Sequence, residues 1–167
     1  MNGKDVLHSV PSVPFRIMEV QEIKFPVRIS QPDDVLNAVK DFKLADRECF
    51  ILLFLDTKNV IIDREVISVG TVDAATVYPR EVLRSAILKN AGSVIMAHNH
   101  PSGDCTPSAA DKQITRDLIA GLLLAQIRVL DHVIFAGDKS YSFTEKGIMP
   151  LMTAEVTKAI NNLGLLT

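Results

Sequence analysis

A polar stretch of the chain, His98–Asp111, separates two segments with different apolar patterns. Before it, Ser93–Ala97 is a short apolar run of strand length, and after it apolar residues recur at helical spacing from Ile114 onward. A strand that leads into a helix is a building unit of sheets covered by helices. The junction therefore predicts a mixed sheet with helices packed against it, which is the α/β or α+β class.

Three side chains at this junction are candidate metal ligands. His98 and His100 are two residues apart, and because strand side chains alternate between faces, both project from one side. Asp111 begins a helical stripe of apolar residues, which continues with Ile114, Leu118, Leu122 and Ala125. A carboxylate on a buried stripe is costly unless it is paired or bound to a cation. We therefore expect His98, His100 and Asp111 to hold one metal ion, and three N/O ligands with an open position are typical of catalytic zinc.

Each part of this pattern also has a purely structural explanation. Ser108 followed by Asp111 three residues later is a helix-capping arrangement, and Thr106–Pro107 is an equally good helix start. A His-x-His pair on its own is more often structural, and Cys105 is more simply a small loop residue than a ligand. The combination of both histidines with an inward-facing Asp111 is what favours a metal site.

The chain has 167 residues, enough for one domain that buries a core without disulfides. Its net charge of −2 gives no sign of a nucleic-acid footprint over the whole chain. The two cysteines lack a pairing pattern, which fits a reducing cytosol. We find no signal-peptide run and no apolar span of membrane length, so we expect a cytoplasmic protein without membrane contact.

The remaining patterns predict three segments: an arm over 1–30 that can include an edge strand, the folded domain over 31–145, and a tail over 146–167 with weak helical character. The apolar run Cys49–Leu55 predicts a strand buried on both faces. The other expected strands are Val60–Val69, Ser93–Ala97, Ile127–Phe135 and Lys139–Phe143, and the expected helices run from Gln31 to near Leu44, from Pro79 to a stop at Gly92, from Ser108 to Ala125 and from Thr153 to Leu163.

The spacing His-x-His-Pro, six further residues, then Ser-x-x-Asp resembles the JAMM signature of MPN-domain metallopeptidases. A closer resemblance, to the RadC family, a bacterial branch of the JAMM group, covers roughly Asp33 to Phe143. The segments that carry it are Arg47–Phe50, Gly70–Ala75, Tyr78–Glu81, His98–Gly103 and Asp131–His132. Full-length RadC proteins carry an extra N-terminal helix-hairpin-helix domain, and we expect this chain to be a short form without it.

The resemblance implies an MPN/JAMM-like fold, a mixed sheet between helices in a cytidine deaminase-like three-layer arrangement. It also implies a zinc-dependent metallopeptidase or isopeptidase, in which a metal-bound water attacks an amide carbonyl of an unidentified peptide or isopeptide substrate. By motif position, Glu48 is then the general base and acid, Ser108 the hydrogen-bond donor to the oxyanion, and His98, His100 and Asp111 the ligands of Zn²⁺.

Other functions are open to the same sequence. The RadC name is associated with DNA repair, which suggests a protein acting on or near nucleic acid, although low basicity argues against it. A metal-binding interaction module without catalysis is a further alternative. A zinc deaminase is excluded because neither His-x-Glu nor Pro-Cys-x-x-Cys occurs. His132 is more simply a core or paired histidine than a ligand, and a supporting contact to a metal-bound histidine is open to it.

Overall fold

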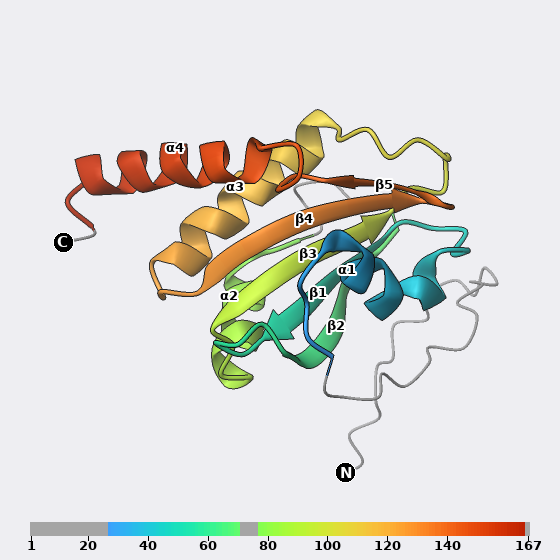
Figure 1. The fold of residues 1–167 in the computed structure, drawn as a ribbon. Helices are drawn as coiled ribbons and strands as arrows, with labels where there is room; N and C mark the ends of the chain where they lie inside the picture. Colours follow the sequence, from blue (N-terminus) through green and yellow to red (C-terminus); the bar gives the residue numbers. More distant parts are fainter. Residues whose placement is uncertain (1–26, 71–76, 166–167) are drawn as a thin grey trace, which may run out of the picture.

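Residues 27–70 and 77–165 are described by the structure, a computed structural model. They form a five-stranded sheet in the order β2-β1-β3-β4-β5, with helices on both faces (Figure 1). The strands are β1 (Cys49–Leu55), β2 (Ile61–Val69), β3 (Ser93–Asn99), β4 (Arg128–Ala136) and β5 (Lys139–Ser142). The helices are α1 (Pro32–Ala38), the 3-10 turn η1 (Lys40–Phe42), α2 (Pro79–Leu88), α3 (Ala109–Leu123) and α4 (Ile148–Asn162). The predicted fold class, a mixed sheet flanked by helices, is confirmed.

The sheet is mixed because β3 and β4 run parallel while the other neighbours run antiparallel. A parallel pair needs a crossover, and α3 supplies it between β3 and β4. The chain therefore leaves the sheet at the C-terminal end of β3 and begins α3 on that same side of the molecule. This topology brings the end of β3 close to the first turn of α3.

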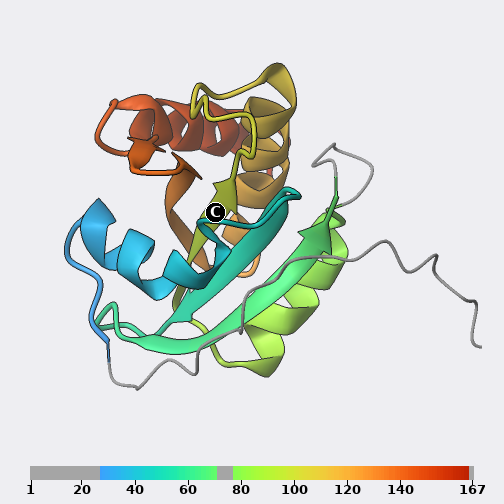
Figure 2. The same cartoon turned by 90° about the vertical axis from the view of Figure 1, so that its right-hand side faces the viewer.

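Alternation along β1 divides the interior into two apolar layers. Phe50, Leu52 and Phe54 belong to the cluster that includes residues of α2, α3 and α4. Ile51 and Leu53, with the other odd-numbered residues of β1, belong to the cluster that includes α1. Figure 2 shows α1 on one side of the sheet and α2 and α3 on the other. Every residue of β1 is buried, so the predicted burial on both faces is confirmed.

The first helix is shorter than the sequence predicts. It ends at Ala38 instead of near Leu44, because Val39 leaves the helical conformation with φ −120° and ψ 15° before η1 begins. The guanidinium of Arg64, on β2, donates to the carbonyl oxygen of Ala38 at 2.7 Å. A side chain from another element thus satisfies a helix-end carbonyl that a continuing helix would have bonded itself.

Two other helix boundaries also differ from expectation. The predicted stop of α2 at Gly92 is wrong, because α2 ends at Leu88 and Asn90 takes the left-handed conformation with φ 57°. The last helix begins at Ile148, earlier than the predicted Thr153, and buries Met149 in the core. Tertiary burial supports this first turn, which local propensity did not indicate.

The end of the predicted N-terminal arm touches the sheet. Arg28 forms an isolated antiparallel bridge with Val60, just before β2 begins. Residues 1–26 lie outside the described part of the chain, so the edge strand expected within the arm over 1–30 is described only from residue 27 on. Within the described ranges, no helix has both the length and the apolar character needed to cross a bilayer.

A buried ion pair fastens η1 to β2. Arg64 donates to both carboxylate oxygens of Asp41, at 2.7 and 2.9 Å, and the two side chains are only 9% and 4% exposed. The guanidinium also lies over the ring of Phe42, 5.2 Å from its centroid. A pair held this way is expensive to break from one side, because the surviving charge stays buried.

Asp41→Ala is therefore expected to lower the free energy of unfolding by about 3 to 5 kcal/mol, measured by urea denaturation. Asp138→Ala is the matched control, because Asp138 pairs with Lys43 on the surface and is itself almost fully exposed. We expect no measurable change in that variant. Equal stability of the Asp41 variant and wild type would show that the buried pair makes no net contribution.

Candidate metal centre

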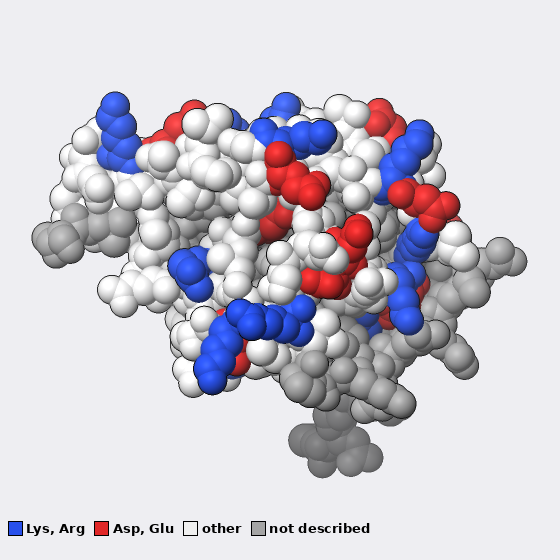
Figure 3. Space-filling model, in the orientation of Figure 1, with Lys and Arg blue, Asp and Glu red and all other residues white. Residues whose placement is uncertain are grey.

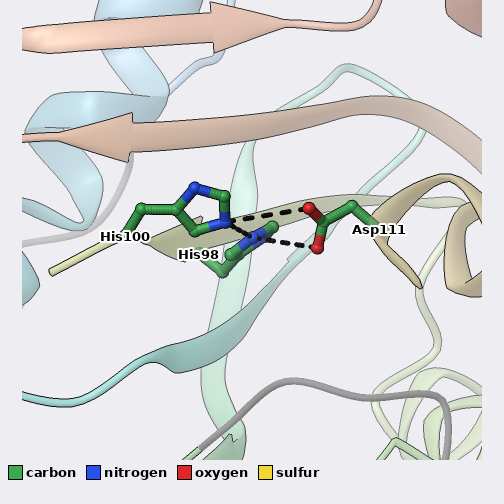
Figure 4. Close-up of side chains that lie close together, drawn as sticks. All are labelled: His98, His100 and Asp111. Atoms are coloured by element: carbon green, nitrogen blue, oxygen red, sulfur yellow. Dashed lines mark hydrogen bonds and ion pairs between the residues drawn. The ribbon is translucent and has the colours of Figure 1, made fainter. Parts of the chain in front are cut away.

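The three candidate ligands meet where β3 ends and α3 begins. His98 lies in β3, His100 follows the strand directly, and Asp111 lies in the first turn of α3. Figure 4 shows the two imidazole rings and the carboxylate turned toward one another. One ligand atom from each residue lies within 4.8 Å of the other two, and no other such group of three occurs among the described residues. The structure thus brings together all three predicted ligands.

The facing atoms are the Nε2 nitrogens of the two rings and the carboxylate oxygens. The two Nε2 atoms are 2.8 Å apart. Asp111 Oδ1 lies 3.2 Å from Nε2 of His98, and Oδ2 lies 3.7 Å from Nε2 of His100. The side chains of His98 and Asp111 are 0% and 3% exposed, whereas that of His100 is 12% exposed. Solvent therefore reaches the group from the side of His100.

The orientation of Asp111 is set by the start of α3. Ser108 is the N-cap, and its hydroxyl oxygen accepts from the backbone N–H of Asp111 at 3.1 Å. In return, Asp111 Oδ2 accepts from the backbone N–H of Ser108 at 2.7 Å. The capping explanation is therefore correct, and it does not compete with the metal explanation. The same capping box that starts the helix points Oδ1 at His98.

The second nitrogen of each histidine has its own partner. Nδ1 of His100 lies 2.7 Å from the carbonyl oxygen of Asp104, and because a carbonyl only accepts, Nδ1 carries the hydrogen. Nδ1 of His98 lies 2.9 Å from Nε2 of His132, inside the protein. Nδ1 of His132 in turn lies 2.7 Å from the hydroxyl of Thr115.

The hydrogen-bond chain through His132 has one consistent direction. Thr115 has a single hydroxyl hydrogen, which it donates to the carbonyl oxygen of Asp111 at 2.5 Å. It therefore accepts from Nδ1 of His132. Complete burial, together with the charge of His98, lowers the pKa of His132 well below its usual value, so the ring is neutral. Its Nε2 must then accept the hydrogen on Nδ1 of His98.

Both Nε2 atoms consequently present lone pairs to the same point. Because Nδ1 of His98 and Nδ1 of His100 each donate to a partner, the neutral form of either ring has no hydrogen on Nε2. A carboxylate of Asp111 completes the group. A proton can bridge only two of these three electron-pair donors, whereas a metal ion satisfies all three at once. The donor set and its outer hydrogen bonds therefore fit a metal ion.

Asp111 is in the protonation state that a ligand requires. Burial by itself would raise the pKa of Asp111. In the absence of a metal, the hydrogen bond and charge of His98 in its protonated form, together with hydrogen bonding from Ser108, outweigh burial and hold that pKa well below its usual range. The carboxylate is therefore ionised at neutral pH and available to a cation.

Comparison with known proteins agrees with this geometry. A family model described as the RadC-like JAB domain matches residues 29–148, well over half of the chain. The chain belongs to the RadC-like JAB family. The resemblance to RadC seen in the sequence motifs is thereby confirmed.

Curated relatives of this RadC-like JAB domain carry the name UPF0758 protein. One from Vibrio parahaemolyticus is 52% identical over 101 residues, which cover 60% of this chain and 45% of the relative. One from Cupriavidus pinatubonensis is 42% identical over 149 residues, 88% of this chain and 64% of the relative. One from Pseudoalteromonas translucida is 46% identical over 118 residues, 68% of this chain and 53% of the relative. The chain thus spans about half to under two thirds of the length of these relatives.

Glu48 and Ser108, the other two residues singled out in the sequence, belong to the segments that precede β1 and α3 of the JAB domain. Glu48 immediately precedes β1 and lines a cavity of about 470 Å³ together with Pro101 and Ser102, the two residues that follow His100. Ser108 is exposed at the N-terminus of α3. Its oxygen accepts a hydrogen bond in the cap, which does not use its own hydroxyl hydrogen. Their catalytic roles stay predictions.

Two residues with a part in the site were not found from the sequence. Thr115 lies one turn after Asp111 on the buried stripe of α3, and a polar residue on that stripe was the available signal. Asn99 lies between the two histidines and is buried, but nothing in its spacing indicated a partner. Cys105 packs against the apolar core and is not part of the metal group.

Thr115→Val is expected to weaken metal binding by about 10 to 100-fold, the usual effect of losing an outer hydrogen-bond partner. The variant keeps the shape of the side chain but leaves Nδ1–H of His132 without an acceptor, so the direction of the chain to His98 is no longer fixed. Thr157→Val is the control, because Thr157 also bonds the carbonyl four residues earlier, at 2.7 Å, but on α4. Competition titration with a chromogenic chelator measures the metal affinity of both variants. A Thr115→Val affinity equal to that of wild type would contradict the proposed direction of the hydrogen bonds from His98 through His132 to Thr115.

Proposed function

We propose that this RadC-like JAB domain is a zinc-dependent hydrolase that cleaves an amide bond. The convergence of two imidazole lone pairs and an ionised carboxylate on one point, beside a cavity lined by Glu48, carries the proposal. Membership of the RadC-like JAB family supports the proposal, because the chain has both the His-x-His and the Ser-x-x-Asp parts of the JAMM spacing. Because the relatives are longer than this chain, we also propose rather than assume that the full-length proteins have this activity.

Zinc is the metal that this donor set favours. Two neutral imidazoles and one carboxylate leave a fourth position open, which is the pattern of catalytic rather than structural zinc. Imidazole nitrogens also argue against calcium and magnesium, which prefer oxygen ligands. When bound, zinc would lower the pKa of a water molecule and polarise a carbonyl group of the substrate.

Glu48 is the proposed general base and acid. Phe50, two residues after Glu48, lies on the face of β1 that packs against α3. His98 is paired with Phe50 across the β1–β3 ladder, so Glu48 lies two residues along the chain from the partner of a candidate ligand, which supports this role. In this role Glu48 removes a proton from the attacking water and returns it to the leaving amine.

Ser108 is the proposed donor to the oxyanion that forms on the carbonyl. It stands at the N-terminus of a 15-residue helix, where backbone N–H groups and the helix dipole favour negative charge. Its hydroxyl hydrogen can turn toward the oxyanion while its oxygen keeps the cap to Asp111. Preorganised donors of this kind typically contribute about 10² to 10³ in rate.

A peptide or isopeptide is the proposed class of substrate. The cavity beside Glu48 is lined by Asp46, Arg47 and Gly70 as well as Pro101 and Ser102, and it is open to solvent. Polar walls and an open mouth suit an extended backbone, whose carbonyl and N–H groups need hydrogen-bonding partners.

Elemental analysis together with a peptide assay tests the proposal. The purified protein is expected to contain close to one zinc per chain, and the zinc form to cleave members of a fluorescence-quenched peptide and isopeptide library. His100→Ala is expected to lack both the zinc and the cleavage. Absence of zinc from wild type, even after incubation with zinc salts and dialysis, would overturn the proposal.

No observation favours a nucleic-acid function over hydrolysis. On the face shown in Figure 3, lysine and arginine side chains are interspersed with aspartate and glutamate among the described residues. A nucleic-acid interface would need basic side chains gathered in one patch or stripe. We therefore propose only the hydrolase.

A further inference from the structure

Asn99 occupies the position between the two histidine ligands and faces the other way. His98 lies on the side of the sheet that packs against α3, together with Val94 and Met96. Strand alternation turns Asn99 to the opposite side, toward the layer of Ala97. It is only 2% exposed, so its carboxamide must find partners inside the protein.

The carboxamide of Asn99 finds those partners in the segment that leads into β1. Its Oδ1 accepts from the backbone N–H of Cys49 at 2.7 Å. Its Nδ2 donates to the carbonyl oxygen of Arg47 at 2.8 Å and, more weakly, to that of Ala45 at 3.4 Å. One side chain thus uses its acceptor and both donor directions on a single short piece of backbone.

These bonds bracket Glu48. The carbonyl of Arg47 belongs to the peptide plane before Glu48, and the N–H of Cys49 belongs to the plane after it. The second plane is held from its other side as well, because the backbone N–H of Gly70 donates to the carbonyl oxygen of Glu48 at 2.9 Å. Since peptide units are planar, fixing both planes fixes φ and ψ of Glu48.

The hydrogen bonds of the Asn99 side chain begin where the backbone ladder between β1 and β3 ends. The β1–β3 register ends with the pair Phe50 and His98, and in the next position Cys49 bonds the side chain of Asn99 instead of backbone. The chain can therefore leave the plane of the sheet at Glu48 without losing its hydrogen bonds. Asn99 in this way links the segment of the proposed base to the strand that carries the proposed ligands.

We propose that Asn99 is the positioning residue that sets Glu48 against the metal centre. The inference rests on the proposed function, since it assigns Asn99 a role only through Glu48. A carboxamide is required because the two peptide planes offer one donor and one acceptor. An aspartate keeps the acceptor for Cys49 but puts an oxygen against the carbonyl of Arg47, which repels it.

The test uses Co²⁺ in place of zinc, because its visible absorption reports the surroundings of the metal. Wild type, Glu48→Gln, Asn99→Asp and Asn99→Ser are loaded with Co²⁺ and their spectra are recorded across the neutral pH range. Both Asn99 variants are expected to have Co²⁺ affinities within about 3-fold of wild type, because the Asn99 side chain bonds backbone groups and none of the three candidate ligand side chains. Their spectra are expected to match that of Glu48→Gln instead of wild type.

Amide hydrogen exchange supplies the second readout. The exchange rate of the Cys49 amide is expected to rise about 10-fold in Asn99→Ser, as for the loss of one hydrogen bond. Ser93→Ala is the control, because Ser93 is buried at the other end of β3, the strand that contains Asn99. This variant should change neither the exchange rate of the Cys49 amide nor the Co²⁺ spectrum.

The outcomes separate the two proposals. A Co²⁺ spectrum of Glu48→Gln identical to that of wild type would show that Glu48 does not affect the surroundings of the metal. That result would contradict both the proposed base and the proposed role of Asn99. If Glu48→Gln differs from wild type but both Asn99 variants keep the wild-type spectrum despite faster exchange at Cys49, the base survives and the role of Asn99 is overturned. Should Asn99→Asp fail to fold, Asn99→Ser decides.

Discussion

Glu48→Gln is expected to bind zinc with wild-type stoichiometry and to lose about 10² to 10⁴-fold of its amide hydrolysis, the usual contribution of a general base. The glutamine keeps the size of the side chain and lines the same cavity as Pro101 and Ser102, but it cannot take up a proton. Zinc content by elemental analysis and initial rates on a peptide identified from the library measure the two effects separately.

Asp46→Asn is the matched control for Glu48→Gln. Asp46 lines the same cavity and is exposed, so its replacement removes one negative charge from that cavity without changing the proposed base. It should keep both zinc and most of the activity. Hydrolysis that is undiminished in Glu48→Gln would remove Glu48 from the mechanism, whereas equal losses in both variants would assign the effect to charge alone.

Asp111→Asn is expected to reduce zinc affinity by more than the roughly 100-fold that marks the loss of an outer hydrogen-bond partner. An amide oxygen can still accept the N–H of Ser108 and keep the cap of α3, so helix formation and metal binding are separated in this variant. The removed negative charge would otherwise help to neutralise a cation bound by this group.

Thermal unfolding with and without zinc gives an independent measure of the Asp111 effect. Zinc that binds only the folded state raises the melting temperature of wild type, and this increase should vanish in Asp111→Asn. Asp117→Asn is the control, because Asp117 lies on α3 bonded to Gln113 and away from the ligands. A wild-type increase in Asp111→Asn would exclude Asp111 as a ligand.

The end of β3 and the residue that follows it combine two tasks at three consecutive positions. His98 and His100 point to the metal centre, while Asn99 holds the backbone on both sides of Glu48. The period of two along a strand makes this possible, because neighbouring residues serve opposite faces. Two candidate ligands and the proposed base are thus held by one short segment, which suits a site whose function depends on exact distances.

Local sequence was sufficient for much of the fold and for the three candidate ligands. The continuous apolar run Cys49–Leu55 predicted β1 at the bounds the structure has. The stripe that begins at Asp111 predicted the buried face of α3, and Asp111 is indeed buried. These features follow from spacing along one segment, and backbone geometry translates such spacing directly into direction.

By itself, the sequence determined the strands, most of the helices and the meeting of His98, His100 and Asp111 within one strand-to-helix junction. Only the tertiary structure decided which distant residues complete the site. Thr115 and His132 are 17 residues apart, His98 and His132 are 34 apart, and Cys49 and Asn99 are 50 apart. Contacts over such separations depend on strand order and register, which arise from packing the whole sheet and leave no periodic signal in any one segment.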